Sequence, residues 1–380
     1  MRVKTTGRRT VAPGLNVNVL RCLLLAYLAC QCSASPGAIS KEASDYLNRA
    51  LDVMRQDSVN RKQIDWRRLR SEARAYAKDA QTTQDTYPAI MYACRQLQDH
   101  SSSFQMPADT PASIRLRSYE VHNKFLPPAH GRQLTDGRPS PFLGSHAISL
   151  AMLTHNGRRY AYLVLRFYSN SQNGDPYPRM GHEWAEGLFR LVAEASRQGV
   201  QGWILDLRGG SAPGYPEPPL AGLQALLGNG KVLEYRGVNK NQAISVKDGA
   251  ILDQGRFSAP YVVERIDERV DFSQQSAPVA ILVDRGTQIM EETLAIAFEG
   301  RDKTYFIGER TTGRTDALSN TSLSDGAVLS VESWRVLDRR GFAYSEGVDP
   351  NLRVEDPPKD TPIVEDPAVA AAEKWLDSQK

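Results

Sequence analysis

The stretch AILVDRGTQIMEETLAIAFEGRDKTYFIGERTTGRT, residues 280–315, decides the fold that this sequence predicts. The apolar run from Val279 to Val283 is typical of a buried strand, and it ends at the turn residues Asp284-Arg285-Gly286. A helical pattern that includes Leu294 and Phe298 comes next, and a second apolar run follows it. We therefore expect a strand, a tight turn, a helix and a second strand, which are parts of a layered α/β domain.

The turn before this helix lacks a nucleophile. A serine at such a strand-to-helix turn lies at the positive end of the helix dipole, which favours developing negative charge. Here the turn reads Thr287-Gln288-Ile289-Met290-Glu291-Glu292 and contains neither serine nor cysteine. The alkyl side chain of Ile289 has no lone pair with which to attack a substrate.

The segment nonetheless resembles the nucleophile region of the tail-specific (C-terminal processing) serine peptidases, especially their compact bacterial, tricorn-like members. Those proteins commonly read T-A-S-S-G-E or T-A-S-A-S-E here, and Thr287 and Glu292 match the two ends of that motif. The resemblance places the reactive serine at Ile289, and Met290 among the oxyanion and binding positions. It implies an α/β (α+β) fold, with a sheet core of strand-strand-helix units like those of crotonases and the Clp protease.

Two other motifs of the resemblance imply a base and an acid. Gln98-Asp99-His100-Ser101 is similar to the family's D-G-H-S or D-x-H-S/T, in which Asp99 is a structural position. In the tricorn-like branch this histidine is the general base, so the resemblance implies that role for His100. The segment from Glu346 to Asn351 matches the closing E-x-G-V-x-P-D region, where Glu346 would orient the base.

The strand from Gly202 to Gly209 matches the family's G-W-I-x-D-L-R-G, with Asp206 and Arg208 as structural positions. In the family an N-x-G-G turn follows, and its backbone N–H groups help to form an oxyanion hole. This chain has Gly210-Ser211-Ala212-Pro213-Gly214 instead, and proline has no N–H to donate. The resemblance assigns Gly209, Gly210 and Gly214 to the oxyanion site, in a turn that is altered at its centre.

The segment from Gly308 to Arg314 is similar to the family's G-E-x-T-x-G-K, with Glu309 as a structural position. In the serine–lysine branch the base is a lysine that follows the serine by 25 residues, and that count leads from Ile289 to Arg314. Because arginine stays protonated, it cannot act as this base, and a serine–lysine mechanism is excluded.

Periodicity and composition divide the chain of 380 residues into four parts. Residues 1–34 have a basic leader, an apolar stretch and small residues at their end, which predicts an export signal and a periplasmic or secreted protein. A weak lipoprotein box ends at Cys30, so a lipid anchor there is the alternative and the only membrane association that we expect. We expect a helical domain at 35–112, the peptidase-like core at 113–356, and a linker with a closing helix at 357–380. The interval between the helical part and the core is too short for a PDZ domain.

Charge and cysteine content narrow the possible partners. Removing residues 1–34 takes away five basic residues and no acidic ones, so the formal net charge of +3 becomes −2, which does not indicate a nucleic-acid ligand. Only Cys94 would remain of the four cysteines, so no intrachain disulfide is expected. No histidine or cysteine spacing predicts a metal site, and we expect no cofactor.

These features predict an exported member of the tail-specific peptidase family that is catalytically impaired. It would bind an extended peptide or a polypeptide C-terminus without cleaving it. The alternative is a working hydrolase in which His100 activates another serine, for which Ser101, Ser102, Ser103 and Ser211 are the candidates. A third possibility is a structural or scaffold protein in which the cleft has no function.

Overall fold

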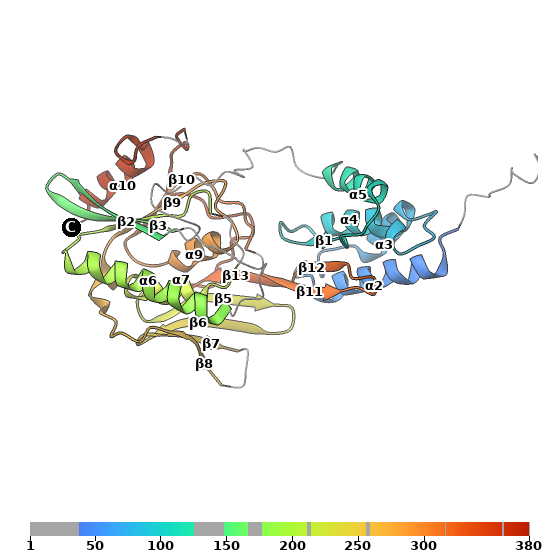
Figure 1. Ribbon diagram of the computed structural model, residues 1–380, viewed down its shortest axis with the longest axis horizontal. Helices are drawn as coiled ribbons and strands as arrows, with labels where there is room; N and C mark the ends of the chain where they lie inside the picture. The colour runs from blue at the N-terminus through green and yellow to red at the C-terminus, as the bar shows by residue number, and fades with distance from the viewer. Residues whose placement is uncertain are drawn as a thin grey trace, which may run out of the picture.

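The computed structural model describes residues 38–124, 148–165, 177–210, 214–255, 259–315, 317–358 and 361–379. They form two lobes of unequal size, with the first helices in the smaller lobe and most strands in the larger one (Figure 1). The predicted signal at 1–34 with Cys30, and the turn residues Ser211 and Pro213, lie outside the described residues. Within the described residues, no helix has the length and the apolar character needed to cross a membrane.

The smaller lobe is built around helices with well-defined starts. The N-cap residue Ser40 accepts a hydrogen bond from the Ala43 N–H at 3.1 Å, and Asp65 caps the next helix in the same way. Pro88 lies in the first turn of a third helix, where its missing N–H has no consequence. The helices of this lobe are α2 (Lys41–Asp57), α3 (Trp66–Tyr76), α4 (Tyr87–Arg95) and α5 (Ala112–Lys124), with a 3₁₀ turn at Gln84–Thr86.

A three-stranded antiparallel sheet completes the smaller lobe with residues from far along the chain (Figure 1). Its strands, in spatial order, are β1 (Ser103–Gln105), β12 (Val328–Glu332) and β11 (Leu318–Ser322). Leu329 and Val331 belong to the same hydrophobic core as the helices. Asp325, between β11 and β12, accepts hydrogen bonds from the hydroxyls of Tyr46 and Tyr87 at 2.6 and 2.7 Å. The lobe therefore draws on residues well beyond the 35–112 range, and the domain limits stay a prediction.

The larger lobe contains a six-stranded sheet in which all neighbouring strands are parallel except β2 and β3. In spatial order the strands are β14 (Leu352–Arg353), β10 (Thr304–Gly308), β9 (Val279–Val283), β4 (Trp203–Asp206), β3 (Arg158–Leu165) and β2 (Ile148–His155). Both faces are buried, because alternate residues enter different cores. Leu205 and Ile281 pack with α6 (Tyr177–Arg197) and α9 (Met290–Phe298), whereas Ile204 packs with α10 (Pro367–Asp377).

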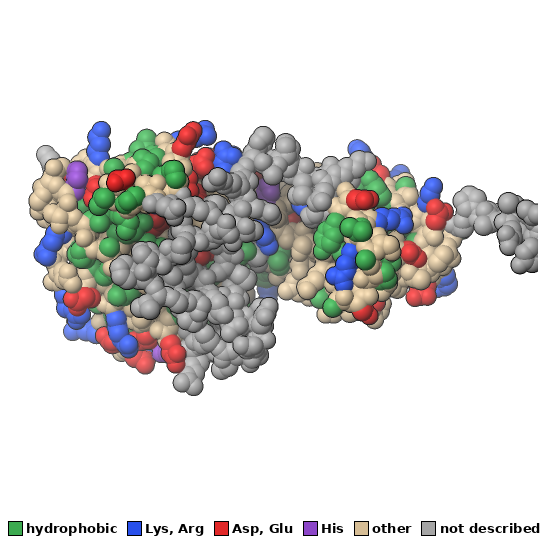
Figure 2. All heavy atoms as spheres, turned by 45° about the horizontal axis from the view of Figure 1, so that its top comes forward, with side chains coloured by type: hydrophobic (Ala, Val, Ile, Leu, Met, Phe, Trp, Pro, Cys, Tyr) green, Lys and Arg blue, Asp and Glu red, His purple; other side chains and the backbone are tan. Residues whose placement is uncertain are grey.

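A second, five-stranded antiparallel sheet lies on the α6 and α9 side of the lobe and shares its core. In spatial order it contains β13 (Trp334–Asp338), β5 (Gly230–Gly237), β6 (Asn241–Lys247), β7 (Ala250–Gln254) and β8 (Tyr261–Arg265). Two short helices, α7 (Glu217–Gly222) and α8 (Gln224–Leu227), and 3₁₀ turns at Phe272–Ser276 and Ile363–Glu365 complete the described elements. In Figure 2, basic and acidic side chains are interspersed over the described part of the visible surface.

The unit predicted for residues 280–315 is confirmed as β9, α9 and β10. β9 and β10 are parallel neighbours in the six-stranded sheet, and the helix between them is buried along its whole length. The predicted mixed α/β fold class is confirmed with it.

Candidate active site

The turn between β9 and α9 holds Ile289 in an unusual backbone conformation. Ile289 is the N-cap of α9, with φ 59° and ψ −111°. Residues other than glycine rarely adopt positive φ, and for a β-branched side chain the strain is about 1–3 kcal/mol. A sharp strand-to-helix turn of this kind presents the nucleophile in many hydrolases. Here it carries an alkyl side chain that is 6% exposed.

Hydrogen bonds from neighbouring segments hold this turn. The Ile289 N–H donates to the Arg314 carbonyl at 2.5 Å, and the Ile289 carbonyl accepts from the Thr293 N–H at 3.0 Å. The Gln288 N–H donates to the Gly210 carbonyl at 2.9 Å, which joins the turn to the glycine-rich segment after β4. Backbone hydrogen bonds from its surroundings therefore help to hold the strained conformation.

Hydrogen bonds of Thr287 and Asp284 connect the same turn to the residues that follow β4. The Thr287 hydroxyl, which is fully buried, donates toward the Leu207 carbonyl at 3.1 Å and the Asp284 carboxylate at 3.0 Å. The Asp284 carboxylate also accepts from the Gly209 N–H at 2.8 Å. Asp284 was expected only as a turn residue and not as a site residue. Its position directly after β9, next to the end of the neighbouring strand β4, is the signal that would have identified it.

Glu292 joins α9 to the loop after β10. Its buried carboxylate accepts hydrogen bonds from the hydroxyls of Thr311 at 2.5 Å and Thr312 at 3.1 Å, and from the Gly313 N–H at 2.8 Å. Burial raises the pKa of Glu292 to about 7, although these hydrogen bonds favour the ionised form. Glu292 therefore links α9 to the loop after β10, and both segments border the turn at Ile289.

The predicted base and acid lie next to each other across the lobe boundary. His100 follows α4 in the smaller lobe, and its Nε2 lies 3.6 Å from the Glu346 carboxylate of the larger lobe. The His100 side chain is 46% exposed and that of Glu346 is 80% exposed, so solvent weakens the attraction between them. The Asp99 carboxylate orients the loop by accepting from the N–H groups of Ser101 and Ser102 at 3.1 and 2.7 Å.

Two of the predicted oxyanion donors point to acceptors within the protein. The Gly209 N–H donates to Asp284, as described, and the Gly210 N–H donates to the Leu207 carbonyl at 3.3 Å. A side chain at Gly210 could not be accommodated, because a Cβ there would lie 2.3 Å from the Glu291 side chain. A Cβ at Gly214 would lie 3.7 Å from the Met290 side chain. Of the predicted set, Gly210 contacts the turn through its carbonyl, and Gly214 lies near Met290, the first residue of α9.

Asp206 and Arg208 form a buried charge cluster with α10. The Arg208 guanidinium lies 2.7 Å from the Asp206 carboxylate and 2.8 Å from that of Asp366, the N-cap of α10, and Asp356 lies 3.3 Å away. Burial alone lowers the pKa of Arg208, but the carboxylates outweigh it and raise the pKa well above its usual value. The cluster fixes the end of β4, and with it the glycines that follow.

The two remaining predicted positions lie in the loop after β10. The Glu309 carboxylate is 3.2 Å from the Arg285 guanidinium and therefore bridges that loop to the turn after β9. Arg314 contributes its carbonyl to the Ile289 N–H, and its side chain is half-buried. The guanidinium stays charged, so the structure offers no base at this position.

The serines beside His100 differ in their surroundings. The Ser102 hydroxyl donates to Asp99 at 2.8 Å and accepts from the Glu332 N–H at 2.9 Å, so it serves the local fold. Ser103 lies in β1, paired with Ser330. The Ser101 hydroxyl is buried and has no hydrogen-bond partner within the described part of the chain. Ser211, the other candidate, lies outside the described residues.

Comparison with solved structures identifies this arrangement of strands and helices. The fold is similar to a lipoprotein from Streptococcus agalactiae, with a TM-score of 0.54 at 16% identity over 90% of this chain and 98% of that chain. It is also similar to the photosystem II D1 C-terminal processing protease, with a TM-score of 0.53 at 16% identity over 87% of this chain and 97% of that chain. At such identities the likeness extends to the fold alone.

Sequence comparison assigns the family. The nisin-resistance protein of Lactococcus lactis subsp. lactis is 26% identical over 191 residues, which cover 50% of this chain and 54% of the relative, about half of its length. The family model described as peptidase family S41 matches residues 160–354, which contain the strand at Asp206, the turn at Ile289 and the loop at Glu346. The chain therefore belongs to peptidase family S41, the tail-specific (C-terminal processing) peptidases that its motifs predicted.

Proposed function

We propose that this member of family S41 is exported and binds extended polypeptide segments without cleaving them. The observation that carries the proposal is Ile289, which occupies the tip of the turn that presents the nucleophile and is held there in a positive-φ conformation. A triad enzyme that loses its nucleophile retains only the small residual rate provided by its binding groups, a decrease on the order of a million-fold.

The surroundings of Ile289 support impaired chemistry over a displaced nucleophile. The N–H groups of Gly209 and Gly210 are engaged within the protein, so they do not point to a substrate oxyanion. His100 Nε2 and the Glu346 carboxylate lie 3.6 Å apart, so the two side chains to which the resemblance assigns the base and its orienting acid are near each other. In this proposal they have no serine at position 289 to activate.

The choice of a polypeptide ligand and of an exported protein rests on the relatives and on the predicted signal. One solved relative is named a C-terminal processing protease, another a lipoprotein, and the curated relative is named for resistance to nisin. We therefore propose an extracytoplasmic protein that binds peptides with a free C-terminus. N-terminal sequencing of the protein recovered outside the cytoplasm tests export, and lipid labelling at Cys30 tests the anchored alternative.

A fluorophosphonate probe tests the loss of catalysis. We expect no labelling of the unmodified protein or of an Ile289→Ala control, and labelling of Ile289→Ser if His100 still acts as a base. Labelling and peptide cleavage by the unmodified protein would refute the proposed impairment. Because serine loses the burial of isoleucine, thermal unfolding must first show that Ile289→Ser is folded.

Peptide binding is tested separately, by fluorescence anisotropy. We expect labelled extended peptides with a free C-terminal carboxylate to bind, and the same peptides with an amidated C-terminus to bind more weakly. Nisin is included because the curated relative carries its name. Absence of binding to every peptide would contradict the proposal and would favour a scaffold protein in which the cleft has no function.

One observation favours the alternative of an active hydrolase. The buried Ser101 hydroxyl has no partner in the described residues and neighbours the predicted base in sequence. If Ser101 is the nucleophile, the unmodified protein reacts with the probe and Ser101→Ala does not. A serine adjacent to its base in sequence is seldom oriented for attack, so we favour the binding function.

A further inference from the structure

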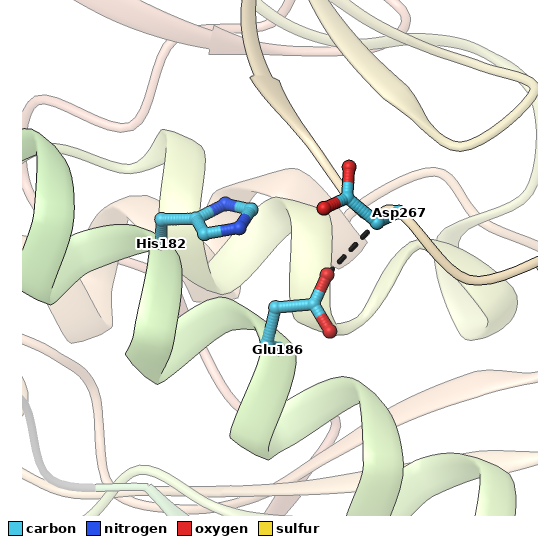
Figure 3. Close-up of side chains that lie close together, drawn as sticks. All are labelled: His182, Glu186 and Asp267. Carbon is cyan, nitrogen blue, oxygen red and sulfur yellow. Dashed lines mark hydrogen bonds between the residues drawn. The ribbon is translucent and has the colours of Figure 1, made fainter.

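Three side chains with metal-binding atoms converge between α6 and the turn that follows β8. His182 and Glu186 lie four residues apart on α6, and therefore on one side of that helix. Asp267 lies two residues beyond the end of β8. One ligand atom from each of the three lies within 4.8 Å of the others. In Figure 3 the imidazole and the two carboxylates point toward one another.

The backbone on both sides of this cluster is fixed by packing. Ala185 and Ile266, the neighbours of two of these residues, are buried in the core of the larger lobe, and the Ile266 N–H donates to the Gly249 carbonyl at 2.9 Å. The Asp267 N–H donates to the Glu186 carboxylate at 3.0 Å, drawn as the dashed line in Figure 3. The cluster is therefore a defined arrangement and not a chance meeting of long surface side chains.

His182 is oriented as metal-binding histidines are. Its Nδ1 lies 2.9 Å from the Glu264 carboxylate of β8, and the Glu264 side chain is only 11% exposed. A hydrogen bond of this kind fixes the tautomer and leaves Nε2 with its lone pair as the ligand atom. Metal-binding histidines commonly have such a carboxylate behind them, which also makes the imidazole a stronger donor.

The local charge favours a cation. Four carboxylates, those of Glu186, Glu264, Asp267 and Glu268, lie in or beside the cluster, and the guanidinium of Arg190 pairs with two of them. Arg190 lies 3.1 Å from both Glu186 and Glu268, and its side chain is 64% exposed, so it can move aside without burying a charge. Each oxygen of the Glu186 carboxylate has a second lone pair for a further partner.

We propose that His182, Glu186 and Asp267 bind one Zn²⁺ ion, with Glu264 positioning the histidine. Zn²⁺ accepts imidazole nitrogen and carboxylate oxygen at about 2.0–2.2 Å, and a water molecule completes a tetrahedral set. Ligand atoms around such an ion lie about 3.4 Å apart, so the three side chains, whose ligand atoms lie within 4.8 Å of one another, must approach by side-chain rotation. The ion would join α6 to the second sheet.

Titration calorimetry of the EDTA-treated protein with ZnCl₂ tests this site. A protein without a polyhistidine tag is needed, because a tag would bind the metal. We expect one saturable site, at least tenfold weaker binding for His182→Gln and Asp267→Asn, and an upward shift of Tm on adding Zn²⁺. Absence of saturable heat would overturn the proposal. Equal binding of MgCl₂ would also overturn it, because Mg²⁺ does not select a nitrogen ligand.

Matched variants separate the site from general surface binding. His155 is the control, because its side chain is also 38% exposed and its Nδ1 also meets a carboxylate, that of Asp377 at 2.7 Å. We expect His155→Gln to bind Zn²⁺ unchanged, and Arg190→Gln to bind several-fold more tightly, since it frees a Glu186 oxygen. An equal loss in His155→Gln and His182→Gln would refute the assignment. Asp267 lies in an exposed turn, so its variant reports on binding even if His182→Gln unfolds.

Discussion

The free energy of unfolding should fall as the pH rises from about 4.5 to about 7, because Glu292 is buried. Replacing Glu292 by glutamine should abolish this fall. Glu292 is fully buried at the start of α9 and is held by the Thr311 hydroxyl and the Gly313 N–H. Burial raises the pKa of this carboxyl group, because the low-dielectric interior disfavours the ionised form. Glutamine keeps the shape and the acceptor oxygen but cannot ionise.

The sign follows from proton linkage. Below pH 4.5 Glu292 is protonated in both states, whereas between 4.5 and about 7 only the folded state holds the proton, so the free energy of unfolding falls with rising pH. Above about 7 the carboxylate is ionised in both states and the loss is complete. One pH unit corresponds to about 1.4 kcal/mol, so the full effect of this group is about 3 kcal/mol.

Urea unfolding between pH 4.5 and 8 measures this effect. The free energy of unfolding of Glu292→Gln should gain about 3 kcal/mol relative to the unmodified protein across this range. Glu42→Gln, at an exposed carboxylate in the first turn of α2, provides a surface control for the same substitution. Parallel curves for Glu292→Gln and the unmodified protein would refute the reasoning, because Glu292 would then titrate equally in both states.

Two further substitutions probe the framework of the site. Arg208→Met leaves the buried carboxylates of Asp206 and Asp366 without this counterion and should cost about 3–5 kcal/mol. Arg310→Met, which removes an exposed ion pair, should have little effect, and urea midpoints compare the two variants. Gly308→Ala should destabilise the protein by at least ~2 kcal/mol or prevent folding. Gly308 has φ 126°, and an added Cβ would lie 2.0 Å from the Val283 carbonyl oxygen. Soluble yield and thermal unfolding measure the effect.

The parts of the fold that the sequence predicts correctly are those with local signals. The run from Val279 to Val283 is apolar on both faces because β9 is covered on both sides, and its length is that of a strand. The pairing of His100 with Glu346 followed from the motif resemblance, since no spacing in one sequence predicts a contact between two lobes.

Contacts between distant residues were not predictable in this way. The hairpin of β11 and β12 enters the smaller lobe, where Asp325 meets a tyrosine 279 residues away. Asp366 reaches Arg208 across 158 residues, which no periodicity reveals. The cluster of His182, Glu186 and Asp267 was not predictable either. The four-residue spacing of the first two is also typical of the exposed face of an amphipathic helix, and Asp267 lies far along the chain, after β8. In each case only the tertiary structure shows which residues are in contact.

The energetics at Ile289 explain how the turn can persist without its nucleophile. The positive φ costs about 1–3 kcal/mol for a residue with a Cβ, and the β-branched isoleucine lies toward the upper end of that range. The buried isoleucine side chain contributes about 1.5–3 kcal/mol through the hydrophobic effect, and a serine in the same place would contribute little. Isoleucine therefore offsets much of the strain, whereas serine leaves it uncompensated and is retained only where its hydroxyl performs a reaction. The hydrogen bonds to Arg314 and Thr293 involve only the backbone of residue 289, so they are available to either residue. A turn stabilised by isoleucine therefore agrees with the proposal that this protein binds peptides without cleaving them.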